Sequence, residues 1–401
     1  MFYEKKDDKL PHVLVKKLYG GKLYTSISRL EKFKACPFSH FLSYGIKLKE
    51  RKEYKLGAPD LGQLFHKGLE NFHGYLMNNQ LVWGNLTHLE MKNIIDNVVG
   101  DVVPLLQNEV LLSTARYRYL TNKLKRILLR AVSVLGEHER RGTFRPLGVE
   151  ITFGEKATLP GLNFKIADGT EIYLQGKIDR VDVARDDKEI YLRVIDYKSG
   201  MSSLSLLEIF YGLKLQLLTY LHVLLKYAPQ FLNGEARPGG VLYFSIKDPF
   251  VIGNKELSVA EIEKKVLLQL KMKGYLLKDP EVIKLMDKDI NGYSDLLPVA
   301  LNKEGNFYKN IQSVLTVEEF DKLRVYVEKV LYDISSDIMS GNVAIAPYRY
   351  KVRESCTFCS YKSVCRFDPA VPGNIYRVLK DKSPDEIWHE LGAEGGELED
   401  E

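Results

Sequence analysis

Apolar residues recur at helical spacing through the first third of the chain, after a charged lead-in over residues 1–24. A helix is expected to start at Ser26 or Ser28, because both are good N-cap residues, and to carry Leu30 and Phe33 on its apolar side. The same helix is expected to reach Phe41.

The helical spacing continues beyond that first helix. Asp60 is expected to be the N-cap of a second helix that carries Leu64 and Leu69 on its buried side. Residues 86–141 repeat Leu, Ile and Val at the same spacing, which predicts further helices.

The pattern changes at Gly148 to short runs rich in β-branched and aromatic residues, separated by turn-forming pairs. The predicted elements are strands at 148–153, 172–183 and 190–196, a helix at 203–227, a strand at 240–246, and helices within 258–340. This order predicts an α/β (α+β) fold with a mixed sheet of about four or five strands, and helices before and after it.

A chain of 401 residues suggests two to three domains. The predicted parts are a lead-in (1–24), a helical part (25–146), a core (147–250), a second helical part with the cysteine-rich segment 354–368 (251–368), and a tail with an acidic, disordered end (369–401).

Charge and hydropathy narrow the class of protein. The net charge is +5, but the last ten residues hold five carboxylates, so the rest of the chain carries about +10, which favours a polyanionic partner. The longest uncharged apolar-rich run covers only residues 215–225, too few to span a bilayer. The charged N-terminus is unlike a secretory signal, so a cytoplasmic location is expected.

Four cysteines form an asymmetric set: Cys36 near one end, and Cys356, Cys359 and Cys365 near the other. A reducing compartment makes disulfides improbable, so the spacing predicts a site of four thiolates. Both zinc and an iron–sulfur cluster accept four thiolates, and typical structural zinc sites use two close pairs rather than one remote ligand.

Two acidic motifs lie on neighbouring predicted strands. Asp196 and Lys198 stand two residues apart in VIDYKSG and therefore point to one face, and Asp179 in GKIDRVD can join them. Two carboxylates suit a hard divalent cation such as Mg²⁺, and a lysine can hold an attacking water or stabilise developing phosphorane charge. Solvated side chains at a strand end remain the alternative.

Two further candidates lie on predicted helices. Gln216 and Tyr220 are four residues apart and share a helix face directly after the second acidic motif. His66 lies one turn after Gly62, where the missing side chain permits a close approach. Taken alone, each of these residues is also compatible with an ordinary core or surface position.

The order G-x-x-x-H, G-x-x-D, D-Y-K-S-G and Q-x-x-x-Y resembles the RecB-type branch of the PD-(D/E)XK nucleases. The segments TSISRLEKFKACPFSHFLSYGIKLKER and APDLGQLFHKGLE make the chain similar to the C-terminal nuclease domain of the AddB family, from about Leu18 to Tyr376. The implied fold is a restriction-endonuclease-like core with a mixed central sheet, a helical N-terminal part and a C-terminal cysteine-rich segment.

The resemblance implies a role for each matched residue. The metal ligands would be His66, Asp179, Asp196 and the backbone carbonyl of Tyr197, and the catalytic set would be Asp179, Asp196, Lys198, Gln216 and Tyr220. Glu150 would have a supporting role, whereas Asp182 is expected to pair with Arg180 or another neighbour.

The same resemblance implies two cofactors. One is Mg²⁺, with Mn²⁺ also tolerated. The other is a 4Fe–4S cluster on Cys36, Cys356, Cys359 and Cys365, which would staple together the two ends of the domain.

The implied function is a DNA exonuclease that cuts single strands, including the strand ending 5′, during double-strand break repair in company with a helicase–nuclease subunit of AddA type. A nucleoid-associated location in bacteria would follow. The chain contains no G-x-x-x-x-G-K-[ST] loop, so no ATPase activity by that route is expected. The alternatives are an inactive DNA-binding or scaffold module, and a RecB-like nuclease of CRISPR-adaptation or phage type.

One basic segment, residues 115–132, interleaves cations with tyrosines and is a candidate to contact phosphates and stack on bases. The candidate DNA-binding residues are Arg116, Arg118, Lys123 and Arg126. A solvated amphipathic helix face explains the same pattern.

Overall fold

The computed structural model describes residues 9–49, 57–105, 115–186, 189–200, 202–253 and 256–395. The first residues of the lead-in and the last residues of the acidic tail lie outside this range, so the predicted disorder of that tail stays a prediction.

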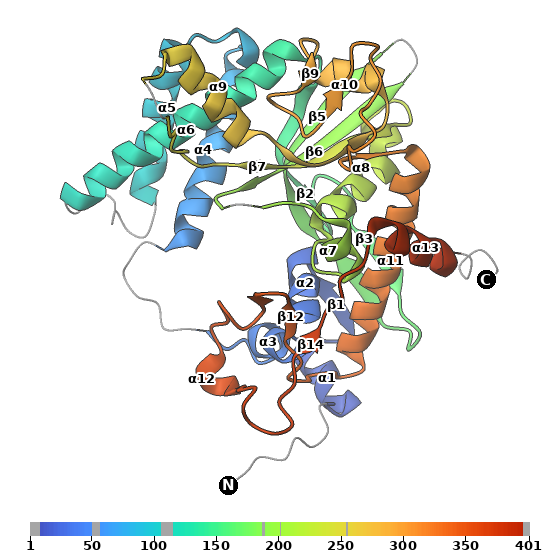
Figure 1. Cartoon of the computed structure of the whole chain (residues 1–401). Coiled ribbons are helices and arrows are strands. Elements are labelled where there is room, and N and C mark those ends of the chain that lie inside the picture. Colours follow the sequence, from blue (N-terminus) through green and yellow to red (C-terminus); the bar gives the residue numbers. More distant parts are fainter. Residues whose placement is uncertain are drawn as a thin grey trace.

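A mixed six-stranded sheet forms the centre of the molecule (Figure 1). In spatial order its strands are β11 (Val314–Leu315), β8 (Lys273–Leu277), β7 (Arg237–Ser245), β6 (Ile190–Lys198), β5 (Gly176–Arg185) and β2 (Arg145–Phe153). The pairs β6–β7 and β8–β11 are parallel and the others antiparallel. The mixed sheet confirms the predicted α/β class, with one strand more than the expected four or five.

The continuous strand predicted at 172–183 is wrong, because the chain there changes sheets. Its first part, β4 (Glu171–Leu174), lies between β1 (Lys22–Thr25) and β3 (Leu162–Lys165) in a separate three-stranded sheet. Gln175 still donates its backbone N–H to Thr25, and β5 then begins at Gly176. The charged lead-in, for which no element was predicted, contains α1 (His12–Tyr19) and most of β1.

The first predicted helix is shorter than expected. Ser26 is the N-cap of α2 (Ile27–Ala35), but this helix ends at Cys36, and Phe41 lies beyond it in η1 (Phe41–Gly45), after the short α3 (Pro37–His40).

Helices of the N-terminal part follow the predicted order. The second helix, α4 (Ala58–Asn78), has Gly57 rather than Asp60 at its N-cap, and Asp60 instead accepts a 2.8 Å hydrogen bond from the Gly57 N–H. The remaining elements are η2 (Trp83–Asn85), α5 (His88–Val102), η3 (Val103–Leu105) and α6 (Ala115–Arg141).

The helix predicted at 203–227 is two helices, α7 (Leu206–Phe210) and α8 (Gln216–Leu232). The turn between them needs Gly212, whose φ of 70° lies in the left-handed region that glycine tolerates best. This break places Gln216 in the first turn of α8.

The region 258–340 is not wholly helical, because short strands alternate with its helices. The helices are α9 (Val259–Leu270), α10 (Pro280–Met286) and α11 (Val317–Met339), and β8, β9 (Gly292–Tyr293), β10 (Ala300–Leu301) and β11 lie between them.

The C-terminal segment from β12 to β14 folds beside α2 and α3 (Figure 1). It contains β12 (Tyr348–Tyr350), β13 (Arg353–Glu354), α12 (Lys362–Cys365) and β14 (Arg377–Val378), and the helix that follows, α13 (Pro384–Gly395), packs against α11 and α7. The described part of the chain contains no helix that is both long and apolar enough to cross a membrane.

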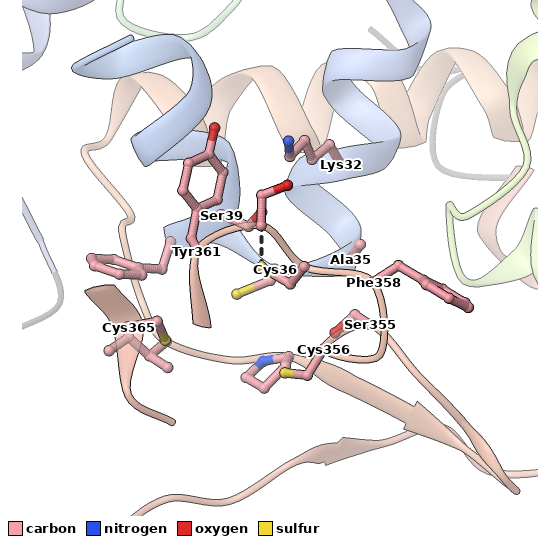
Figure 2. Close-up of a pocket in the computed structure, with 14 residues that line it drawn as sticks. Lys32, Ala35, Cys36, Ser39, Ser355, Cys356, Phe358, Tyr361 and Cys365 are labelled. Carbon is pink, nitrogen blue, oxygen red and sulfur yellow. Dashed lines mark hydrogen bonds between the residues drawn. The ribbon is translucent and has the colours of Figure 1, made fainter. Parts of the chain in front are cut away.

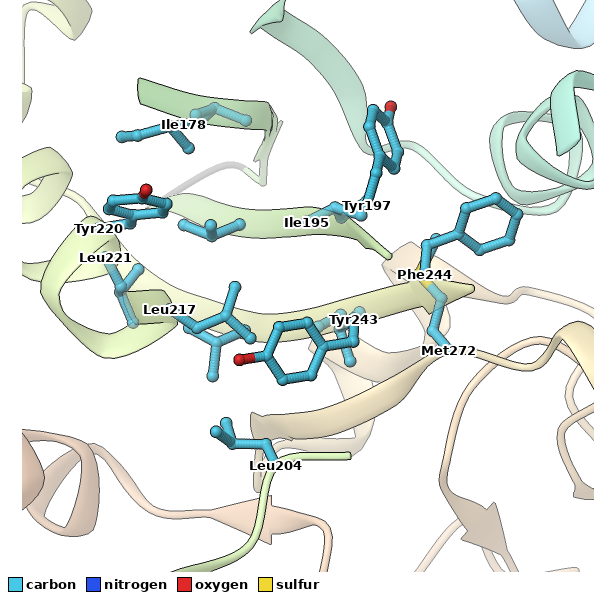
Figure 3. Close-up of a cluster of buried hydrophobic side chains, with 14 of the residues drawn as sticks. Ile178, Ile195, Tyr197, Leu204, Leu217, Tyr220, Leu221, Tyr243, Phe244 and Met272 are labelled. Carbon is cyan, nitrogen blue, oxygen red and sulfur yellow. The ribbon is translucent and has the colours of Figure 1, made fainter. Parts of the chain in front are cut away.

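A continuous hydrophobic core holds α8 against β6 and β7 (Figure 3). Ile195, Leu217 and Phe244 are almost completely buried in it, and Tyr220 and Tyr243 pack alongside. Burial of each such side chain stabilises the fold by roughly 1.5–3 kcal/mol. This packing fixes α8 over the strands that carry Asp179 and Asp196.

Candidate active site

Three side chains of the types that bind metals meet where β2, β5 and α4 come together. The β2–β5 register pairs Val149 with Arg180, which places Glu150 beside Asp179. His66 Nδ1 lies 3.3 Å from Asp179 Oδ1 and 3.4 Å from Glu150 Oε1. One ligand atom from each of His66, Glu150 and Asp179 lies within 4.8 Å of the others.

The charges of this group are strongly coupled. Burial alone would lower the pKa of His66, but its hydrogen bonds to Asp179 and Glu150 outweigh burial and raise the pKa to about 10. Burial opposes ionisation of Glu150, yet His66 and an ion pair with Lys177 hold its pKa below the usual value. A metal ion bound here would take the place of the His66 proton, because an imidazole must be deprotonated to act as a ligand.

Asp196 lies deeper, on β6, and is only 1% exposed. Burial and the neighbouring charge of Asp179 raise its pKa to about 6, although Lys198 and His66 oppose the shift. Lys198 Nζ lies 2.5 Å from Asp196 Oδ2, so the predicted common face of these two residues is confirmed. A second cation would relieve the repulsion between Asp179 and Asp196.

Asp179 also holds the two strands together. Its Oδ2 accepts a 2.7 Å hydrogen bond from the backbone N–H of Tyr197, and the adjacent register pairs Arg180 with Ile195. The Tyr197 ring packs edge-on against His66 at 5.9 Å. Asp179 contacts the backbone N–H of Tyr197, and the Tyr197 carbonyl as a metal ligand remains a prediction.

Gln216 and Tyr220 extend the site from α8. Lys198 Nζ donates to Gln216 Oε1 at 3.3 Å, and Gln216 Nε2 donates to the Tyr220 hydroxyl at 2.8 Å. The structure thus joins Asp196, Lys198, Gln216 and Tyr220 in one chain of polar contacts.

A pocket of about 610 Å³ opens onto the first group of ligands. Its walls include His66, Glu150, Asp179 and Lys177, and Gly62 from the same helix as His66. A substrate phosphate in this pocket would therefore meet ligands from three separate elements.

A buried ion network lies behind the site. Asp182 accepts from Arg180 Nε at 2.6 Å and from an Arg193 terminal nitrogen at 2.5 Å, and Glu139 of α6 also pairs with Arg180. The prediction that Asp182 pairs with Arg180 is confirmed. Because Asp182 is fully engaged here, it is a poor candidate for a metal ligand.

The four cysteines line one cavity of about 180 Å³, although they come from opposite ends of the sequence (Figure 2). Burial raises the pKa of Cys36 and of Cys356, and raises that of Cys365 to about 11. Such thiols stay protonated unless a metal displaces the proton.

None of the described basic side chains of α6 lines the pocket beside His66. Arg118 and Lys123 are exposed, whereas Arg126 forms a 2.6 Å ion pair with Asp248. The side chain of Arg116 lies outside the described residues. The role of this segment in DNA binding stays a prediction.

Two residues at the site were not fully predicted from the sequence: Glu150 was expected only in a supporting role, and Lys177 was not expected at the site. Glu150, expected only to support the site, lies as close to His66 as Asp179 does. Lys177, two residues before Asp179, pairs with Glu150. Lys177 and Asp179 are two residues apart on one strand and therefore share a face, so this spacing could have placed Lys177 beside the site.

Comparison with known proteins places these motifs in a family. Residues 24–366 match the PD-(D/E)XK nuclease superfamily. The chain is 48% identical over 97% of its length to a protein from Desulforamulus reducens, and 46% identical over 98% to one from Pelotomaculum thermopropionicum. A protein from Heliobacterium modesticaldum is 44% identical over 98%.

All three relatives are named as a subunit of an ATP-dependent helicase/deoxyribonuclease. The chain spans about a third of their length, namely 34%, 34% and 33%. The match covers the helix that carries His66 and both acidic strands. The chain belongs to the PD-(D/E)XK nuclease superfamily.

Proposed function

We propose that this chain is a metal-dependent deoxyribonuclease that hydrolyses phosphodiester bonds in single-stranded DNA, acting as an exonuclease in double-strand break processing and recombinational repair. One observation carries the proposal. The metal-binding group of His66, Glu150 and Asp179 adjoins the polar chain from Asp196 through Lys198 to Gln216.

The donor atoms suit a hard divalent cation. His66, Glu150, Asp179 and Asp196 offer one imidazole nitrogen and carboxylate oxygens, which favour Mg²⁺ and tolerate Mn²⁺. When bound, such an ion supplies Lewis-acid polarisation of a phosphoryl oxygen and acidifies water.

The remaining residues act around that ion. Lys198 can stabilise charge that develops on the phosphoryl oxygens, since its ammonium stands beside Asp196. Gln216 accepts a hydrogen bond from Lys198 and so fixes the position of the lysine ammonium. The Tyr220 hydroxyl accepts a hydrogen bond from the Gln216 amide and so orients Gln216. The Tyr197 backbone N–H holds Asp179 in place.

We infer that the four cysteines hold a 4Fe–4S cluster. A zinc tetrahedron with 2.3 Å bonds needs its sulfur atoms about 3.8 Å apart. Among the described residues only His66, Glu150 and Asp179 bring three or more donor atoms within 4.8 Å of one another, so no three of the cysteine sulfur atoms lie that close together. That wider spacing favours a group larger than one zinc ion.

The partners are inferred from the relatives. Their name joins a helicase to a deoxyribonuclease and designates one subunit of the assembly, which supports DNA as the substrate and a helicase–nuclease subunit of AddA type as partner. A bacterial cytoplasmic, nucleoid-associated location follows from that role. We propose that the chain divides into five parts, residues 1–24, 25–146, 147–250, 251–368 and 369–401.

The test is end-labelled DNA incubated with the purified chain and saturating Mg²⁺. We expect single strands to be shortened progressively and much faster than blunt duplex, with no effect of ATP and no cleavage in excess chelator. DNA binding without cleavage at any metal concentration would favour the inactive scaffold instead. Labels at the 5′ and 3′ ends, compared in parallel, decide the polarity.

A further inference from the structure

Glu31 on α2 reaches the start of the helix that carries Gln216. Its Oε1 accepts hydrogen bonds from the backbone N–H groups of Leu215 at 2.7 Å and Gln216 at 3.1 Å. The contact joins segments that are 184 and 185 residues apart in the sequence. Glu31 is partly buried, and burial raises the pKa of its carboxyl although these N–H groups and Lys214 oppose the shift.

The N-terminus of α8 needs an outside partner. The first N–H groups of any helix have no partner within the helix, and a nearby side chain normally accepts them. Leu215 occupies the N-cap position of α8 and has no polar side chain to do so. A carboxylate at this end also interacts favourably with the helix dipole. Glu31 therefore replaces the local cap.

The position of Gln216 depends directly on this cap. Gln216 is the first residue of α8, and its side chain contacts both Lys198 and Tyr220. Because Glu31 fixes the Gln216 N–H, it also fixes the point from which that side chain reaches Lys198. The charge of Lys198 is close enough to Glu31 to act on its pKa.

The other end of α2 belongs to the cysteine site. The helix ends at Cys36, and Lys32 lines the cysteine cavity. Lys34 lies against Gly212 in the α7–α8 turn, and its carbonyl accepts from Arg377 of β14. One short helix thus contacts both the cysteine cavity and the turn before Gln216.

We propose that Glu31 is a positioning residue that holds Gln216, and through it Lys198, and that α2 thereby ties the cysteine site to the catalytic side chains. The activity part of this inference rests on the proposed nuclease function. The structural part stands by itself, because it concerns the N-terminus of α8.

The first measurement is amide hydrogen exchange over residues 211–220, which needs no cleavage. We expect Glu31→Ala to speed exchange there about tenfold or more, since both N–H groups lose their acceptor. Glu31→Gln keeps an acceptor oxygen and should stay near the parent. Glu90→Ala is the control, because Glu90 also accepts a backbone N–H at a helix N-terminus, that of Thr87 at 2.8 Å, but belongs to the capping box of its own helix α5.

The second measurement is a double-mutant cycle in steady-state cleavage. We expect Glu31→Ala to lower kcat by roughly 10- to 100-fold with KM and iron content unchanged. Adding it to Gln216→Ala should cost little more than Gln216→Ala alone, because both act on Lys198. Glu31→Gln should restore most of the rate. If Glu31→Ala does not fold, Glu31→Asp, whose shorter carboxylate cannot reach both N–H groups, takes its place.

The outcomes separate the two proposals. Unchanged exchange over 211–220 in Glu31→Ala, or fully additive losses in the cycle, would overturn the role of Glu31. A parent chain that does not cut DNA would overturn the proposed function, and accelerated exchange confined to Glu31→Ala would still support the cap.

Discussion

Asp179 accepts a 2.7 Å hydrogen bond from the backbone N–H of Tyr197, the residue that separates Asp196 from Lys198. One carboxylate thus serves two purposes. Its Oδ2 aligns β5 with β6, while its Oδ1 faces His66 at 3.3 Å in the proposed metal site. Alignment of the strands and assembly of the ligands are therefore parts of the same interaction.

Substitutions of Asp179 should separate these two purposes. Both Asp179→Asn and Asp179→Ala remove a charged ligand, so we expect both to lose cleavage and to bind metal more weakly. Asp179→Asn can keep an oxygen acceptor for the Tyr197 N–H, whereas Asp179→Ala leaves that buried donor unsatisfied, which costs about 1–3 kcal/mol.

Urea denaturation in the absence of metal measures this difference. Asp179→Asn should be as stable as the parent or more stable, because it also relieves the repulsion that raises the pKa of Asp196. Equal stability of the two variants would contradict the structural role of Asp179.

Two parts of the candidate site could be predicted because each depends only on the spacing of residues within one strand or one helix. Alternation along β6 places Asp196 and Lys198 on one face whatever the rest of the fold does. The four-residue spacing of Gln216 and Tyr220 likewise survives the break between α7 and α8. Local periodicity was enough in both cases.

Long-range geometry was not predictable in this way. Glu150 joins the site only because of the β2–β5 register, and it has a left-handed φ of 55° that no local pattern signals. The run 172–183 looks like one strand since both of its halves are β-rich, and only the packing of β1 beside β4 separates them. Pairing between strands that are distant in the sequence therefore determines both the position of Glu150 and the break in the run 172–183.

Lys198→Ala should abolish most of the activity without disturbing the fold. It removes the cation beside Asp196 that would stabilise developing phosphoryl charge, so we expect the cleavage rate to fall about 100- to 1,000-fold. Lys214→Ala is the matched control, because Lys214 lies over the same Tyr243 ring, at 5.7 Å against 5.4 Å for Lys198. A single-turnover assay at saturating Mg²⁺ should show near-parent cleavage only for the control. Parental cleavage by Lys198→Ala would rule out this lysine.

Buried His40 should make the fold sensitive to acid. It packs among the rings of Tyr19, Phe33 and Tyr44, and burial, with the charges of Lys32 and Arg29, lowers its pKa to about 3. Between the unfolded pKa of about 6.5 and this folded value, only the unfolded chain binds the proton. Stability therefore falls as the pH falls, by about 1.4 kcal/mol per pH unit well below pH 6.5.

His40→Phe tests this assignment, because it keeps a ring and cannot be protonated. Urea denaturation at pH 7.5 and 5.5, with iron content followed alongside, should show a weaker loss of stability in the variant. Buried His138 and His222, whose pKa values are also lowered, account for the remaining loss. An unchanged pH dependence would show that His40 does not control it.

Cys36→Ala should act on the fold rather than on the chemistry. Cys36 is the only one of the four cysteines outside the C-terminal segment, and it closes a loop of roughly 320 residues. By loop-closure entropy, such a cross-link is worth on the order of 5 kcal/mol. The variant would leave the proposed 4Fe–4S cluster with three thiolates, and such a cluster is labile, so we expect loss of iron and of the visible chromophore, with weaker DNA binding.

Limited proteolysis locates the effect. In Cys36→Ala, cleavage should appear both near α2 and α3 and in the segment from β12 to β14, because these two regions face the same cavity. Lys198→Ala, which removes no thiol, should keep its iron and resist the protease like the parent. Removing iron from the parent chain should reproduce the pattern of Cys36→Ala. If Cys36→Ala instead retains iron and protease resistance, the two ends of the chain are held together by packing alone, and the cluster is not a staple.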